Sequence, residues 1–80
     1  MSNAKILVAG GGGFIGGHLV ADLRSRGFTD IRVVDIKPFD QWYQVFDGVE
    51  NAVADLKLID NCREACHGVD TVYNLAADKL

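Results

Sequence analysis

Residues 10–16, near the start of the chain, have the residue types and spacing that point most clearly to a chemical function. Three glycines occupy the fixed places of the pattern G-x-x-G-x-x-G, namely Gly10, Gly13 and Gly16. Gly10 permits a tight turn, Gly13 lets a phosphate approach the backbone, and Gly16 allows a following helix to pack closely. The N–H groups at a helix start bind anions, because they lack partners within the helix and lie at its positive end. The spacing therefore predicts a diphosphate site.

An acid follows at the end of the next predicted strand. Asp35 stands 19 residues beyond Gly16, where a carboxylate accepts hydrogen bonds from an adenosine ribose and repels a 2′-phosphate. The Asp35 carboxylate favours NAD over NADP, although Lys37 nearby would weaken its repulsion of the 2′-phosphate. The alternative is a simple glycine turn followed by a surface aspartate. We favour the dinucleotide site because its parts occur together and in order. A nucleoside-triphosphatase loop is excluded, since no Gly-Lys-Ser or Gly-Lys-Thr occurs.

The elements that must position these residues alternate between strand and helix. Short apolar runs predict strands, and apolar stripes at three- and four-residue spacing predict helices. The expected strands are 5–9, 31–36, 52–54 and 71–76, the expected helices are 14–26 and 58–67, and residues 39–49 are expected to form a loop with one helical turn. This order predicts an α/β fold: a truncated, doubly wound Rossmann sheet of about four parallel strands, ordered 3-2-1-4, with crossover helices. Residues 1–80 would form one N-terminal half-domain.

The first predicted helix has an apolar stripe that should face the sheet. Ile15, Leu19 and Leu23 form this stripe, and Val20 widens it. Gly27 stands where a helix commonly ends in a left-handed residue.

Two cysteines lie four residues apart in the second predicted helix. The spacing places Cys62 and Cys66 on one apolar face, with Ile59 a turn earlier. We interpret them as small core residues rather than, with His67, as a metal site, because three candidate ligands do not complete a zinc tetrahedron.

Aromatic residues are concentrated in the predicted loop. Trp42, Tyr43 and Phe46 are expected to cover the sheet near its second and third strands, or else to flank the adenosine or an oligomer contact. His18 is expected to be a solvated helix residue.

Composition narrows the class of protein. The chain has 80 residues, 49% hydrophobic and 24% charged, with a net charge of −3, and these values are typical of a globular domain. We expect no nucleic-acid partner, because no basic face stands out. We expect no membrane span, because no apolar stretch approaches about 20 residues. Strand-forming residues follow the start of the chain directly, so we also expect no signal peptide and a cytoplasmic protein.

Several segments resemble the extended short-chain dehydrogenases/reductases, the NAD-dependent epimerases and dehydratases of nucleotide sugars. Gly10–Gly16, with Phe14 and Ile15 between the last glycines, is similar to the family's loop, which reads G-x-x-G-F-I-G. Asp55-Leu56 resembles the pair after the family's third strand, where the aspartate contacts the adenine. Leu75-Ala76-Ala77 resembles the segment that lines the cofactor beyond the fourth strand.

The family's catalytic pair, Tyr-x-x-x-Lys, does not occur in the chain. Tyr43 is followed four residues later by Asp47, and Tyr73 by Ala77. The resemblance therefore implies an NAD-binding fragment of a nucleotide-sugar epimerase or dehydratase that is not catalytically complete alone. Two alternatives stay open, a non-catalytic NAD-sensing domain and an oligomer-forming fragment that binds no cofactor.

The predictions for site and partners are as follows. The expected cofactor-binding residues are Gly10, Gly12, Gly13, Phe14, Ile15, Gly16, Asp35, Ile36, Lys37, Asp55, Leu56, Leu75, Ala76 and Ala77, with no catalytic and no metal-ligating residue. The expected ligand is NAD or its adenosine-diphosphate part. The fourth strand would be left as an apolar edge, so we expect a homodimer or higher homo-oligomer.

Overall fold

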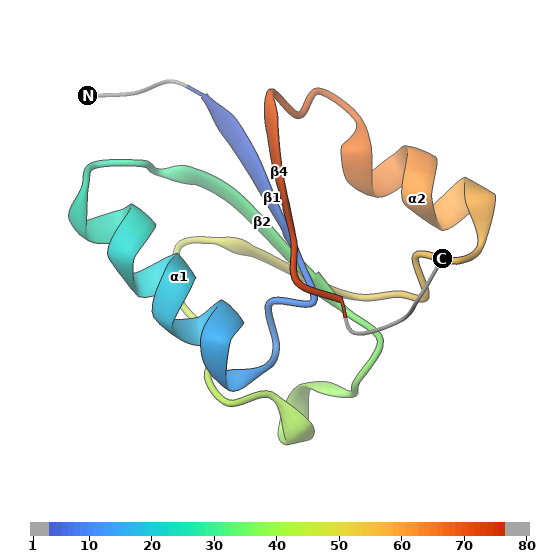
Figure 1. The fold of residues 1–80 in the computed structure, drawn as a ribbon, viewed down its shortest axis with the longest axis horizontal. Coiled ribbons are helices and arrows are strands. Elements are labelled where there is room, and N and C mark those ends of the chain that lie inside the picture. Colours follow the sequence, from blue (N-terminus) through green and yellow to red (C-terminus); the bar gives the residue numbers. More distant parts are fainter. Residues whose placement is uncertain (1–3, 77–80) are drawn as a thin grey trace.

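The computed structural model describes residues 4–76. Its elements are β1 (Lys5–Ala9), α1 (Phe14–Ser25), β2 (Asp30–Asp35), the 3-10 turn η1 (Phe39–Gln41), β3 (Glu50–Val53), α2 (Ile59–Cys66) and β4 (Thr71–Asn74). Within these residues the four strands are parallel and lie in the order β3-β2-β1-β4, with α1 on one face of the sheet and α2 on the other (Figure 1). The predicted fold class and strand order are confirmed.

The centre of the sheet is β1, which pairs with both β2 and β4. Ile6 lies beside Ile31 of β2, and Leu7 lies beside Val72 of β4. Side chains alternate between the faces, so the apolar run of β1 supplies two cores. The core under α1 consists of Ile6, Val8, Val20, Leu23, Ile31, Val33 and Trp42, and the smaller core under α2 consists of Leu7, Val34 and Ala65.

The short strands differ from the prediction by one or two residues. β3 covers Glu50–Val53 rather than 52–54, because it pairs with the stretch from Arg32 to Asp35 of β2 and ends where β2 ends. Similarly, β4 ends at Asn74, which pairs with the last residue of β1. The helical turn expected in the loop is present as η1.

The buried face of α1 differs from the predicted stripe. Ile15 is 66% exposed, whereas Gly16, Gly17, Val20 and Leu23 are buried. The prediction that Ile15 faces the sheet is wrong, because Gly16 lets the start of the helix lie directly on the turn that follows β1, while Gly17 lies against the ring of Tyr43. The expected left-handed ending is present one residue past the cap, at Gly27, whose φ is +94°.

The cysteines of α2 do not belong to the core. Ala65 is the only buried residue of this helix, while Cys62 is half-buried and Cys66 is exposed. Ile59, at 62% exposed, also points away from the sheet. The prediction of two core cysteines is therefore wrong. Ala65 is the residue of this helix that is buried in the core beneath it, and the two cysteines lie outside that core.

Arg32 of β2 fixes the far end of α2. Its Nη1 donates hydrogen bonds to the carbonyl oxygens of Glu64 (3.2 Å), Ala65 (2.6 Å) and His67 (3.2 Å). Its Nε lies 3.0 Å from the Glu50 carboxylate. The last carbonyls of a helix lack partners within it and lie at its negative end, so a guanidinium placed there stabilises the helix.

Two of the three loop aromatic residues cover the sheet as predicted. Trp42 is buried in the core under α1, and Phe46 packs against that core. Tyr43 is 55% exposed and instead lies in a small aromatic group with Phe14 and His18 beside α1. His18 is exposed, as expected. Among residues 4–76, no helix is both long and apolar enough to cross a membrane.

Candidate cofactor-binding site

The turn after β1 requires glycine at its first position. Gly10 has a φ of +79°, and a Cβ built there would lie 2.6 Å from the backbone nitrogen of Ala76. Its own N–H donates to the Val34 carbonyl oxygen at 2.7 Å. Both the backbone conformation and the passage of the chain after β4 therefore exclude a side chain at this position.

Gly16 allows α1 to approach that turn closely. A Cβ on Gly16 would lie 2.5 Å from the Cα of Gly11, well inside the closest approach of two carbon atoms. The first turn of the helix therefore packs on the backbone of the glycine turn. This contact directs the start of α1, which begins directly after Gly13, toward the carboxyl end of the sheet.

Gly13 differs from these two glycines, because no protein atom excludes a side chain there. Its φ of −82° and ψ of 178° suit any residue, and a built Cβ has only the Gly10 carbonyl oxygen nearby, at 3.9 Å. Gly13 is the N-cap of α1, and no acidic residue stands in the first turn. The free N–H groups of a helix start and an open approach to them coincide at this position.

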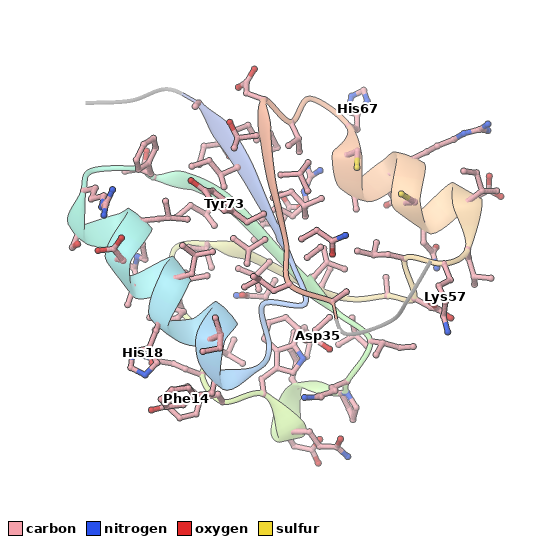
Figure 2. The ribbon with its side chains drawn as sticks, viewed as in Figure 1. Phe14, His18, Asp35, Lys57, His67 and Tyr73 are labelled. Atoms are coloured by element: carbon pink, nitrogen blue, oxygen red, sulfur yellow. The ribbon has the colours of Figure 1, made fainter. Side chains whose placement is uncertain are left out.

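The carboxylate of Asp35 connects the end of β2 to the glycine turn. Its Oδ2 accepts the Gly12 N–H and its Oδ1 accepts the Lys37 N–H, both at 3.0 Å. The side chain is only 8% exposed and is aimed at the turn, at the carboxyl end of the sheet (Figure 2). The acid and the glycine turn are thus in direct contact, although 23 residues separate Gly12 from Asp35.

A groove of about 430 Å³ opens beside this contact at the carboxyl ends of the strands. The predicted site residues that line it are Gly10, Gly13, Asp35, Ile36, Lys37, Asp55, Leu56, Leu75 and Ala76. An open groove at this edge of a parallel sheet, between the ends of its central strands, is where doubly wound folds bind their ligands. A larger hollow of about 720 Å³ lies between α2 and β3, and none of the predicted site residues lines it.

Four of the predicted residues that the structure describes do not line the groove. Gly12 is buried, and a Cβ there would meet Asp35 and Trp42. Gly16 is covered by the turn. Phe14 and Ile15 are exposed, and Figure 2 shows Phe14 beside His18, away from Asp35. Ala77 lies outside the described residues.

The groove is also lined by side chains that the sequence did not predict to belong to the site. These are Cys62 and Cys66 of α2 and Asn74 at the end of β4. Asn74 could have been recognised as a polar residue that ends an apolar strand. Its Oδ1 accepts the Ala76 N–H at 3.2 Å and so shapes the chain that passes Gly10.

Asp55 occupies the bend between β3 and α2. Its Oδ1 accepts the Lys57 N–H at 3.0 Å, and its backbone oxygen accepts the Asn61 side-chain amide at 3.2 Å. An aspartate that bonds to the backbone two residues later is typical of a tight bend. The bend places Asp55 and Leu56 on the groove wall.

These features together define a Rossmann-type dinucleotide-binding fold: the 3-2-1-4 parallel sheet, the glycine turn before α1 and the acid at the end of β2. Comparison with known proteins gives the family. Residues 6–80 match the NAD dependent epimerase/dehydratase family, and the chain belongs to it.

Named relatives and a solved structure agree with this assignment. The chain is 39% identical over 74 residues to GDP-mannose 3,5-epimerase 1 of Oryza sativa subsp. japonica, covering 92% of the chain and 19% of that protein. It is 37% identical over 76 residues to GDP-mannose 3,5-epimerase of Arabidopsis thaliana, covering 95% and 20%. The UDP-glucose 4-epimerase of Thermus thermophilus, in complex with NAD, superimposes with a TM-score of 0.77 at 32% identity, covering 92% and 24%. The chain thus spans about a fifth of the length of the curated relatives it matches.

Proposed function

We propose that this chain binds NAD as the N-terminal part of a nucleotide-sugar epimerase or dehydratase. The observation that carries the proposal is Gly13. The protein's own packing and backbone conformation do not require glycine there, yet the position opens onto the groove at the start of α1. A ligand that approaches the backbone closely would leave no room for a side chain, and this would explain the glycine at position 13.

The proposed binding mode assigns one part of the cofactor to each part of the groove. The diphosphate lies against the backbone of the turn at Gly10 and Gly13 and the N–H groups at the start of α1. The adenosine ribose bonds to the remaining lone pairs of Asp35. The adenine lies against Asp55 and Leu56, with Leu75 and Ala76 on the opposite side.

Catalysis would need residues that the chain does not contain. NAD, when bound, supplies a hydride acceptor, but the tyrosine and lysine that move the proton in the family are absent from these 80 residues. The groove is also open beside β4, so binding would be weak. We expect a Kd in the high micromolar range or above, about −5 kcal/mol or weaker. We place the protein in the cytoplasm.

Titration with NAD tests the proposal. The wild-type chain is compared with Gly13→Val and Asp35→Ala by chemical-shift changes in two-dimensional NMR spectra, which detect weak binding. We expect saturable shifts for the wild type, none for Gly13→Val, and reduced affinity for Asp35→Ala. NADP, with its 2′-phosphate facing Asp35, should bind more weakly than NAD. Absence of saturable binding by the folded wild type would leave the fragment without a cofactor and refute the proposal.

A second proposal is that the chain self-associates through β4. Val72 (49% exposed) and Tyr73 (39%) leave both faces of β4 uncovered, and Leu75 (37%) directly after the strand is also exposed. A sheet edge with unpaired backbone groups and apolar side chains promotes pairing with another chain. Light scattering should find a homodimer or larger species. A monomer at high concentration contradicts this second proposal and leaves NAD binding unaffected.

A further inference from the structure

The cysteine pair of α2 forms part of the groove wall and has no role in the proposed binding of NAD. Cys62 and Cys66 are the chain's only cysteines, and both are free thiols that line the same groove. They stand four residues apart, one helical turn from each other along α2. Two sulfur atoms therefore face one accessible space from a rigid element.

The spacing does not suit a disulfide. Cβ atoms four residues apart on a helix are roughly 5–6 Å apart. A disulfide needs about 3.5–4.5 Å, so closing the bond would distort α2. A bridging ion that bonds to both sulfur atoms spans the larger separation without unwinding the helix.

The number of donors narrows the class of ion. Within the described residues, no group of three His, Cys, Asp or Glu side chains is placed to hold a metal. Zinc requires about four such ligands. Thiolates select soft cations such as Cu(I), for which two sulfur ligands suffice.

We propose that Cys62 and Cys66 form a two-coordinate site for a soft monovalent cation of the Cu(I) class in the wall of the groove. On binding, two S–H bonds break, two S–Cu bonds form and two protons leave to water, while copper stays in the +1 state. The site then carries a net charge of −1 beside Asp55 and Leu56. Provided that NAD binds as proposed, the occupied site weakens its binding, because the two ligands share one groove.

Anaerobic titration of the reduced chain with Cu(I), in competition with a chromogenic Cu(I) chelator, tests the site. We expect one Cu(I) per chain in the wild type and in the control His67→Gln, which changes the residue that follows Cys66 in the sequence. Cys62→Ser and Cys66→Ser should each lower the affinity by at least about 100-fold. Circular dichroism checks that each variant keeps its helices. Retained affinity in either serine variant, or one Cu(I) per two chains, overturns the proposal.

The coupling to NAD is measured separately. NAD titration of the copper-loaded chain should give an affinity lower by about tenfold than that of the copper-free chain. An unchanged affinity overturns the coupling. If the copper-free chain binds no NAD, the proposed function fails, and the copper titration still decides the metal site.

Discussion

Alanine substitutions at Gly10 and Gly13 should affect different properties. Gly10→Ala should lower the stability of the fold, whereas Gly13→Ala should lower the affinity for the cofactor. In Gly10→Ala the left-handed backbone costs about 1–2 kcal/mol, and overlap of the new methyl group with the chain at Ala76 adds about 1–3 kcal/mol. A chain of this size has only about 4–12 kcal/mol of total stability. We therefore expect Gly10→Ala to lose a large part of the free energy of unfolding.

The same change at Gly13 should leave the fold intact. The backbone there is extended, and the nearest protein atom lies 3.9 Å from the new Cβ. Two small effects oppose each other, poorer capping of α1 and a less flexible unfolded chain, so stability should change by less than about 1 kcal/mol. The methyl group enters the space proposed for the diphosphate, and NAD affinity should fall at least about tenfold, or 1.4 kcal/mol.

Gly27→Ala separates the two contributions at Gly10. Its φ of +94° is left-handed too, but a Cβ there meets nothing within 4 Å. Urea unfolding followed by circular dichroism should place Gly27→Ala between the wild type and Gly10→Ala, and NMR titration should show unchanged NAD binding. The reasoning is refuted if Gly10→Ala is as stable as Gly27→Ala, or if Gly13→Ala binds NAD like the wild type.

Three further predictions concern the core, the cap of α2 and the thiol pair. Leu23→Ala should lower the free energy of unfolding by about 2–5 kcal/mol, whereas Ile15→Ala should change it by less than about 0.5 kcal/mol, as urea unfolding measures. Arg32→Met should destabilise the chain by about 1–3 kcal/mol, because the carbonyls at the end of α2 lose their donor, and hydrogen exchange should quicken there first. Burial and the neighbouring Cys62 thiol raise the pKa of the Cys66 thiol, so folding favours its protonated form. Its alkylation by iodoacetamide should therefore begin at higher pH than that of the unfolded chain, and Cys62→Ser should lower that pH; identical profiles in urea and in buffer would contradict this.

The strand order and the meeting of Asp35 with the glycine turn could be predicted from sequence. Alternating strand and helix patterns with right-handed crossovers allow few arrangements of four parallel strands. The carboxyl ends of those strands meet at one edge, so an acid at the end of β2 lies near the turn that follows β1. That Gly12 and Lys37 donate to the carboxylate depends on the exact path of two loops, and no residue pattern encodes it.

Two features could not be read from hydrophobic patterns. Gly16 is buried on the bare turn and Gly17 against the ring of Tyr43. Glycine contributes no apolar signal, so the apolar pattern predicts Ile15 on the buried face instead. The face of α2 with Cys62 and Cys66 does have the pattern of a core face, but only Ala65 reaches the sheet. Whether a helix face is covered depends on the elements next to it in space, and the spacing of apolar residues along the helix does not indicate which elements those are.

The most direct test of the account is residue-resolved NMR mapping of NAD on the isotope-labelled chain. The account predicts saturable shifts at the amides of the turn, residues 10–16, at those after β2, residues 35–37, and at Asp55 and Leu56. It also predicts little change at the amino ends of the strands, around Phe28, which precedes β2. Shifts confined to the hollow between α2 and β3, or an unperturbed turn at saturating NAD, would contradict it.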